Sequence, residues 1–158
     1  MPDHLPQQDV PLQDATLKAY VTAFETLTPD TLDTNLGLLL ADNVVFKDPF
    51  NHVTGRTRTL AVFKHMFATV SRPKFTVFMA AQDPNRPQCA LLYWQFDFEL
   101  PSNQSVQQID GMSRVTFNTE GLVSEHIDYW DAGEQVYAKV PLLGWGIRQV
   151  IKRLSAHP

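Results

Sequence analysis

The alternation of apolar and polar residues is clearest between residues 107 and 131. Two runs with a period of two, 107–117 and 122–131, flank a turn at 118–121 that contains glycine, which is typical of a β-hairpin. Successive side chains of a strand point to opposite sides, so one face of the first run carries Ile109, Gly111, Ser113, Val115 and Phe117. This face is apolar but small at Gly111 and Ser113. The pattern predicts a sheet that bends here or lines a cavity.

Three helices are predicted before residue 73, because apolar residues there recur at intervals of three and four. They cover residues 14–27, 29–41 and 57–72. Thr28 is the expected N-cap of the second helix, with Pro29 in its first turn, and Pro73 ends the third. The residues predicted to face inward are Leu17, Tyr20, Val21, Phe24, Leu27, Leu32, Leu36, Leu39, Leu40, Leu60, Phe63, Phe67 and Val70.

Strands are predicted wherever the period is two. A short one, Val44–Lys47, is closed by Asp48-Pro49 and followed by a loop at 51–55; longer ones lie around 75–79 and 93–100. Helices segregated from a meandering sheet indicate an α+β fold. We expect N-terminal helices in the concave side of a curved, mostly antiparallel sheet. Three helices cannot cover such a sheet completely, so a cone-shaped barrel with an internal cavity is predicted.

Composition is that of a soluble, single-domain protein. The chain has 158 residues, 44% of them apolar and 19% charged, which suffices for one core. Its apolar runs are far too short to span a membrane, and its first residues lack the basic start and apolar stretch of a signal peptide. The lone Cys89 offers neither a disulfide nor a metal-binding spacing. A cytoplasmic location is predicted.

Charge separates the C-terminal part from the rest. With nine of the 13 cations and all 17 acids, residues 1–134 carry −8, whereas the remainder carries +4. So acidic a body is not expected to bind nucleic acid. We divide the chain into a loose leader (1–13), a main domain (14–131) and an amphipathic basic helical tail (132–158), in which Pro141 and Gly144 separate two helices. The tail could cover the cone, pack in a homodimer or rest on an anionic membrane surface.

Three local signatures resemble the nuclear transport factor 2-like superfamily, which includes SnoaL-like polyketide cyclases and ketosteroid isomerase. They are NVVFKDP, Gly55 followed by a helix, and IDG…RVTFNTEGLV…YWD. In this order they resemble the family over about residues 14–131. The resemblance implies the cone-shaped fold and a homodimer. The fold hosts isomerases, cyclases, epoxide hydrolases and non-catalytic proteins, so it leaves the activity open.

The resemblance also implies a candidate catalytic set. Ketosteroid isomerase uses an Asp as base, with a Tyr and a protonated Asp donating to the oxyanion. Asp48 falls on the motif position of the base, and Tyr20 is similar in placement to the oxyanion Tyr. Ser113 stands where the second acid would be, and a serine is a weaker donor. Each has a plainer structural interpretation: Asp48 as a turn residue, Tyr20 as a core residue, and Ser113 as a small residue that relieves crowding.

The last strand adds a second set of candidates. His126, Asp128 and Trp130 share one face, while Ile127 and Tyr129 lie on the other, and either face could be interior. If the first is, His126 and Asp128 could act as an acid–base pair. A metal site there would need a third ligand, and none is evident.

Asp110 lies on the face opposite Ser113. It is therefore expected to point to solvent or an interface, unless Gly111 marks a bulge.

The pocket walls are expected from inward-facing apolar residues, namely Trp94, Phe63, Phe67 and Val115. The same residues are equally typical of an ordinary core. No phosphate-binding glycine loop, Gly-x-Ser-x-Gly elbow or HExxH motif occurs, so we predict no cofactor and no metal.

The leading hypothesis is a protein that binds a small apolar or carbonyl-containing ligand. If it is an enzyme, it would transfer a proton next to the carbonyl, as isomerases and cyclases do. One alternative is a non-catalytic ligand-binding or protein-interaction module. Another is an epoxide-hydrolase-like enzyme that activates water, which would need His126 or Asp128 inside with a cation such as Arg114 nearby.

Overall fold

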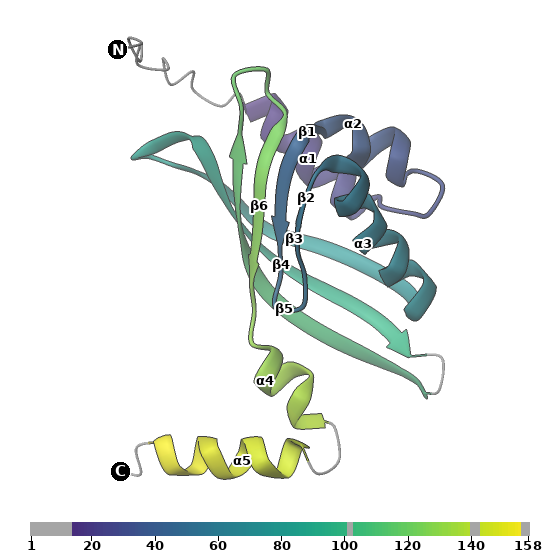
Figure 1. The fold of residues 1–158 in the computed structure, drawn as a ribbon, viewed down its shortest axis with the longest axis vertical. Helices are drawn as coiled ribbons and strands as arrows, with labels where there is room; N and C mark the ends of the chain where they lie inside the picture. The colour runs from purple at the N-terminus through teal and green to yellow at the C-terminus, as the bar shows by residue number, and fades with distance from the viewer. Residues whose placement is uncertain (1–13, 101–102, 140–142, 156–158) are drawn as a thin grey trace.

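The computed structural model describes residues 14–100, 103–139 and 143–155 (Figure 1). The predicted leader, 1–13, lies outside these residues. The helical elements are α1 (Asp14–Glu25), the π-helical η1 (Leu32–Leu36), α2 (Gly37–Leu39), α3 (Arg56–Thr69), α4 (Ala132–Gln135), the 3-10 helix η2 (Tyr137–Lys139) and α5 (Leu143–Leu154). The strands are β1 (Leu40–Lys47), β2 (His52–Thr54), β3 (Ser71–Asp83), β4 (Arg86–Leu100), β5 (Asn103–Phe117) and β6 (Val123–Tyr129).

The strands form one mixed sheet in the order β2-β1-β6-β5-β4-β3. Neighbouring strands are antiparallel except β1 and β6, which run parallel. Figure 1 shows the sheet strongly curved, with α1 and α3 on its concave side. The α+β class and the curved sheet with helices on one side are confirmed.

The core lies between these helices and the inner face of the sheet. The predicted alternation of β5 is confirmed: Ile109, Ser113, Val115 and Phe117 are buried, whereas Met112 is exposed. Apolar side chains of α1, α3 and η1 pack against this face, and their burial supplies most of the favourable free energy of such a fold. The deeply buried side chains include Tyr20, Leu32, Leu36, Leu40, Val44, Val115 and Val123.

The second helix is shorter than predicted. Its last turn ends at Leu39, and Leu40 already has the extended backbone of β1, with φ −93° and ψ 136°. The sequence pattern extended the predicted helix through Leu40, because this leucine lies at helical spacing from Leu36. Its pairing with Val123 of β6 outweighs that local preference, since tertiary context routinely overrides propensity.

Two other local predictions need correction. The loop predicted at 51–55 contains β2, which pairs with β1 and is too short for a period of two to show. The predicted alternation around 75–79 breaks at a register shift between Val77 and Met79, which leaves Phe78 and Met79 both exposed. Pro73 lies inside β3, the outermost strand, where a missing N–H is tolerated.

The C-terminal part leaves the sheet after β6. Helix α4 and η2 follow, and α5 then packs mainly against η2. Gly144 lies within the first turn of α5 rather than before it, and Pro141 is outside the described residues. Among the residues described, no helix is long and apolar enough to cross a membrane.

Candidate functional site

Five side chains form a continuous chain of hydrogen bonds beneath the helices. The Tyr20 hydroxyl lies 2.8 Å from His126 Nδ1, and His126 Nε2 lies 2.6 Å from Asp128 Oδ1. Ser113 Oγ donates to the same oxygen at 2.5 Å and accepts from Trp94 Nε1 at 2.7 Å. The network therefore joins α1 to three neighbouring strands of the sheet, β4, β5 and β6.

The directions of these hydrogen bonds assign the protons. An ionised carboxylate only accepts, so Nε2–H of His126 donates to Asp128. In the neutral imidazole Nδ1 is then the acceptor, and the Tyr20 hydroxyl donates its hydrogen bond to it. This arrangement fits a neutral imidazole and a protonated Tyr20. Burial, and secondly the negative charge of Asp128, raise the pKa of Tyr20 well above its ordinary value, so the phenol remains a donor.

Strand register brings the network together. Ser113 of β5 stands directly opposite Asp128 of β6, and Trp94 of β4 stands opposite Gly111 of β5. A Cβ atom at Gly111 would lie 2.9 Å from the ring of Trp94 and 2.9 Å from Cβ of Trp130. The glycine therefore leaves room for the indole to lie across β5 and reach Ser113. The strand is regular at this point, so Asp110 points outward and is exposed.

Asp128 borders two cavities. The smaller, of about 40 Å³, is lined by Ser113, His126 and Asp128 together with the apolar residues Phe24, Phe63, Phe75, Val77, Leu92 and Trp94. The larger, of about 520 Å³, shares Phe63, Phe75, Trp94 and Asp128 with it and extends past Asp48 to Phe50, Leu100, Trp130 and Val136. No described residue donates a hydrogen bond to Asp128 Oδ2. The walls are mainly aromatic and aliphatic, and no Lys or Arg is among these lining residues.

Asp48 and Tyr20 do not converge in this pocket. Asp48 borders the larger cavity, but its Oδ1 accepts from the backbone N–H groups of Phe50 at 2.7 Å and Asn51 at 2.6 Å. The Asn51 amide adds bonds to both carboxylate oxygens, at 3.1 and 3.0 Å. Asp48 thus closes the turn between β1 and β2. Tyr20 is fully buried and is not among the residues that line either cavity.

The structure resolves which face of β6 is interior. His126 is 4% exposed, whereas Tyr129 is 54% exposed, so His126, Asp128 and Trp130 are on the inner side. Of the predicted wall residues, Trp94 and Phe63 line both cavities. Val115 is buried in the core instead, and Phe67 packs partly buried against it.

The link from Trp94 through Ser113 to Asp128 was not predicted. Ser113 and Asp128 were expected in the two strands of one hairpin, but not as a pair. Counting outward from the turn at 118–121 would have set Ser113 opposite His126. The register shift between Thr116 and Phe117 is what brings Asp128 opposite Ser113, and nothing in the sequence indicates that shift. Nothing local in the sequence indicates that the Trp94 indole reaches Ser113, because that depends on the space left by Gly111.

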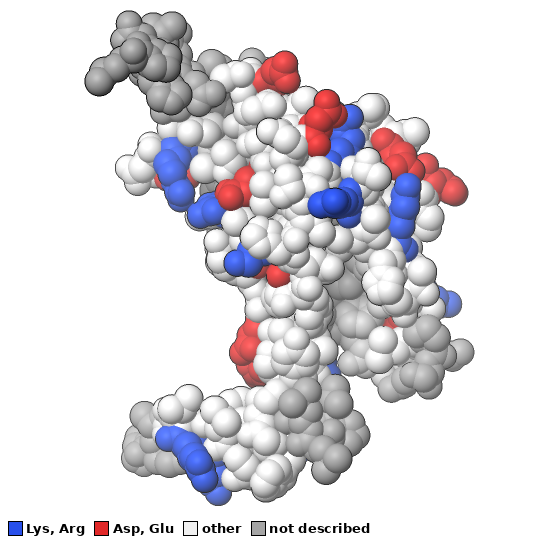
Figure 2. All heavy atoms as spheres, in the orientation of Figure 1, with Lys and Arg blue, Asp and Glu red and all other residues white. Residues whose placement is uncertain are grey.

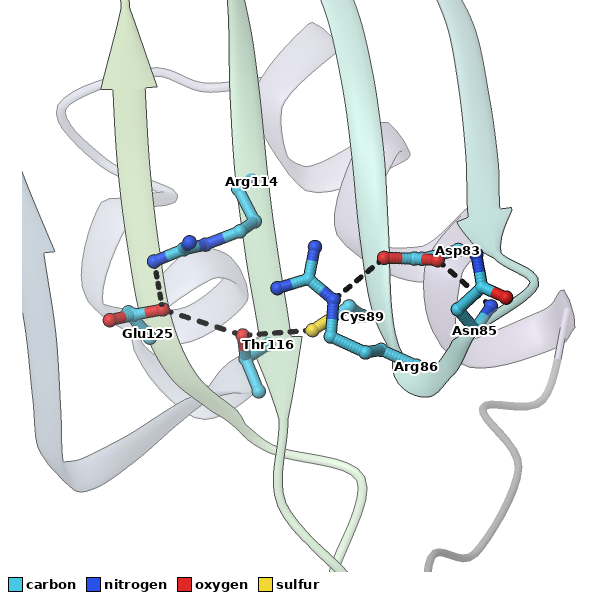
Figure 3. A network of polar contacts seen from close by, with 7 residues as sticks. All are labelled: Asp83, Asn85, Arg86, Cys89, Arg114, Thr116 and Glu125. Atoms are coloured by element: carbon cyan, nitrogen blue, oxygen red, sulfur yellow. Dashed lines mark hydrogen bonds and ion pairs between the residues drawn. The ribbon is translucent and has the colours of Figure 1, made fainter.

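Arg114 lies on the opposite side of the sheet from the pocket. Its Nη2 is 2.9 Å from Glu125 Oε2, which is also 3.5 Å from the hydroxyl of Thr116. Figure 3 shows these contacts continuing through Thr116 to Cys89, and separately the ion pair of Arg86 with Asp83. The cation that an epoxide-hydrolase-like mechanism would need beside Asp128 is therefore not supplied by Arg114.

The described residues also offer no metal centre: they contain no group of three or more His, Cys, Asp or Glu side chains that could hold an ion. His126 and Asp128 would need a third ligand for such a site.

Comparison with solved structures places the fold in the nuclear transport factor 2-like class. A ketosteroid isomerase-like protein from Catenulispora acidiphila, in complex with trimethylamine, has a TM-score of 0.65 and 14% identity, covering 80% of this chain and 92% of that one. A putative polyketide cyclase from Pseudomonas putida has a TM-score of 0.63 and 16% identity, covering 77% and 92%. The Δ5-3-ketosteroid isomerase of a Mycobacterium species has a TM-score of 0.59 and 15% identity, covering 77% and 95%.

Sequence comparison narrows this class to one family. The family model of the SnoaL-like domain matches residues 17–126, which is most of the chain. The chain belongs to the SnoaL-like family. A search of curated proteins found no match, and the identities to the solved structures are low enough that they show the shared fold alone.

Proposed function

We propose that the protein binds a mainly apolar carbonyl compound in the larger cavity and transfers a proton next to the carbonyl, as an isomerase or a cyclase. The observation that carries this proposal is the setting of Asp128. Oδ1 is held by Ser113 and His126, no described residue donates to Oδ2, and Asp128 lines two mainly apolar cavities. A carboxylate oriented in this way beside mainly apolar walls is suited to act as a general base.

The proposed reaction uses Asp128 as the group that receives the proton. Oδ2 takes a proton from the carbon beside the carbonyl, and the electron pair of the C–H bond becomes the enolate. In an isomerase, the same oxygen returns the proton to a second carbon of the enolate. In a cyclase, the enolate carbon forms a bond to the carbon of a second carbonyl group of the same ligand, the π electrons of that group move to its oxygen, and this oxygen takes the proton back from Asp128. Holding carboxylate and carbon in one geometry contributes to the rate.

This assignment differs from the set implied by the family resemblance, in which Asp48 is the base and Tyr20 and Ser113 donate to the oxyanion. Both carboxylate oxygens of Asp48 accept hydrogen bonds within its turn. The Ser113 hydroxyl donates its hydrogen bond to Asp128. Tyr20 donates to His126 behind the pocket. We propose that Tyr20, His126 and Ser113 orient Asp128 rather than contact the ligand.

Hydrogen–deuterium exchange into ketones tests the proposal. The protein would be incubated in D₂O with a Δ5-3-ketosteroid and with 2-tetralone, and exchange at the carbon beside the carbonyl followed by NMR. We expect Asp128→Asn to lower the exchange rate by about 100-fold or more and Asp48→Asn to leave it nearly unchanged. Exchange lost in Asp48→Asn and retained in Asp128→Asn would reverse the assignment. No exchange by the wild-type protein with any ketone of a broader panel would contradict the enzymatic proposal.

A second candidate function is non-catalytic binding of an organic cation that carries apolar substituents. The carboxylate of Asp128 lies among Phe63, Phe75 and Trp94, with no Lys or Arg lining the cavities, and aromatic rings around a negative charge attract ammonium groups. The Catenulispora protein with this fold is in complex with trimethylamine. Choline should then raise the melting temperature more than its uncharged isostere 3,3-dimethylbutan-1-ol, and Asp128→Asn should abolish the difference. Equal shifts would contradict cation binding.

We also propose a homodimer and a cytoplasmic location. Met79, Tyr93, Met112 and Tyr129 stand opposite one another in register across four strands, and all are exposed on the outer face. A row of large apolar side chains of this kind supports an interface.

The cytoplasmic location is supported by the single, unpaired Cys89, because proteins of oxidising compartments commonly use disulfides.

A further inference from the structure

Helix α5 has an apolar face that the described residues of the chain leave uncovered. Ile147, Val150, Ile151 and Leu154 lie on one side at helical spacing. Val150 is 55% and Leu154 81% exposed. Figure 1 shows α5 set apart from the sheet, at the end where β6 leads into α4. Within the described part of the chain, nothing packs on this face.

The charges of α5 show what kind of surface would match it. Arg148 and Arg153 lie at the two edges of the apolar face, and Lys152 lies behind it, while residues 135–158 contain no Asp or Glu. Figure 2 shows cations on the visible side of α5, whereas cations and acids are interspersed over the sheet. Cations that bracket an apolar face are typical of helices that lie in the interface of an anionic bilayer.

A second copy of the chain is the competing partner for this face, because residues 1–134 carry −8. Five acidic side chains of the body pair with cations of their own chain, namely Asp33, Asp42, Asp83, Glu99 and Glu125. A bilayer surface offers both acyl chains for the apolar face and phosphates for the cations at its edges.

The mouth of the larger cavity lies at the same end of the molecule. Phe50 and Leu100 line that cavity and are also exposed, so they mark its opening, and Val136 between α4 and η2 lines it as well. Tyr137 of η2 contacts the ring of Phe50 at 5.9 Å between centroids, and α5 packs on η2. A surface bound to α5 would therefore lie close to the cavity mouth.

We propose that α5 docks the protein on anionic lipid bilayers, with its apolar face in the interface and its cations on the lipid phosphates. Docking does not depend on the acid–base function proposed above, although a cavity mouth near lipid suits an apolar ligand. It needs neither Asp128 nor an identified ligand, so the two proposals fail separately.

Vesicle co-sedimentation of the full-length protein tests this proposal. Vesicles of phosphatidylcholine alone would be compared with vesicles containing phosphatidylglycerol, at low and at high salt. We expect binding only to the anionic vesicles, weakened by salt. Lys152→Glu with Arg153→Glu should weaken it by about tenfold or more, and Ile151→Ser with Leu154→Ser should abolish it. The matched control, Lys18→Glu with Arg58→Glu, makes the same charge change at exposed positions of the body and should bind like the wild type.

These substitutions are at exposed positions, and circular dichroism with thermal melts would confirm that each variant is folded. Absence of binding to anionic vesicles, or equal weakening by the control pair, would overturn the proposal. So would loss of self-association in the Ile151→Ser, Leu154→Ser variant without any vesicle binding by the wild type. That outcome would assign the helix to a second copy of the chain.

Discussion

His126 links Tyr20 to Asp128. Each imidazole nitrogen has one partner, the Tyr20 hydroxyl at Nδ1 and Asp128 Oδ1 at Nε2, and the tautomer with its proton on Nε2 donates to the carboxylate and accepts from the phenol. Neither residue requires contact with a ligand to matter for the site. In the mechanism we propose, their role is to fix Oδ1 of Asp128, so that Oδ2 keeps its direction.

Removing the Tyr20 hydroxyl should therefore destabilise the protein. Tyr20→Phe leaves Nδ1 of the buried His126 without a donor, and an unsatisfied buried polar group costs about 1–3 kcal/mol. Urea denaturation would measure the change in the free energy of unfolding. Tyr129→Phe, at an exposed tyrosine of β6, is the control and should unfold like the wild type. Equal stability of Tyr20→Phe and wild type would contradict the hydrogen bond.

The raised pKa of Tyr20 predicts loss of stability in alkali. Below its ordinary pKa of 10.0, the phenol is protonated in both the folded and unfolded states, so its contribution is constant. Above it, the unfolded chain loses the proton and the folded protein keeps it, so stability falls as pH rises, by at most about 1.4 kcal/mol per pH unit. Urea midpoints between about pH 8 and about pH 11 should fall more steeply for wild type than for Tyr20→Phe. Parallel curves would contradict the shift.

At the scale of elements, Gly111 is the position on which the network most depends. Its missing side chain lets Trp94 of β4 and Trp130, which follows β6, approach β5. No turn or positive φ requires a glycine here; the requirement is space.

Gly111→Ala should strain the sheet and displace Trp94. The new methyl group would stand 2.9 Å from the indole and from Cβ of Trp130, and overpacking of this kind costs about 1–3 kcal/mol. Thermal or urea unfolding would measure the loss, and a change in tryptophan fluorescence would report the moved indole. Gly146→Ala in α5 is the control, since nothing lies within 4 Å of its added atom. An unaltered Gly111→Ala protein would show that the strands can separate at no cost.

Hydrophobic periodicity was enough to predict which side chains point inward in the elements that have one buried face. The alternation in β5 set Ser113 inward and Met112 outward, and the helical stripe of α1 placed Tyr20 inside. It could not decide between the faces of β6, because His126 and Asp128 are polar and the competing Ile127 and Tyr129 are apolar. His126 and Asp128 can be buried because Tyr20 and Ser113 supply their remaining hydrogen bonds. Tyr20 comes from a helix distant in sequence, and Ser113 from the neighbouring strand. For the same reason, Asp48 could be recognised by its motif but not seen to be engaged in its turn.

At the scale of the whole molecule, the exposed row on the outer face predicts self-association. Met112→Lys places a charge in the middle of the row formed with Tyr93 and Tyr129, where burying it against a second copy would be unfavourable. Light scattering coupled to gel filtration should show a dimeric wild type and a monomeric variant. Leu38→Lys, at an exposed leucine of α2 remote from this row, should remain dimeric. A monomeric wild type would contradict the interface.

The parallel pairing of β1 with β6 also governs how the chain can fold during synthesis. Leu40 has no sheet partner on this side until Val123 has been made, and His126 reaches Tyr20 later still. The apolar surfaces of α1, η1 and β1 therefore emerge from the ribosome long before the strand that covers them, and such delayed long-range closure slows folding and exposes chains to aggregation. A nascent chain arrested before β6 should be sensitive to protease and bound by chaperones, and one arrested after the tail has cleared the exit tunnel should be resistant.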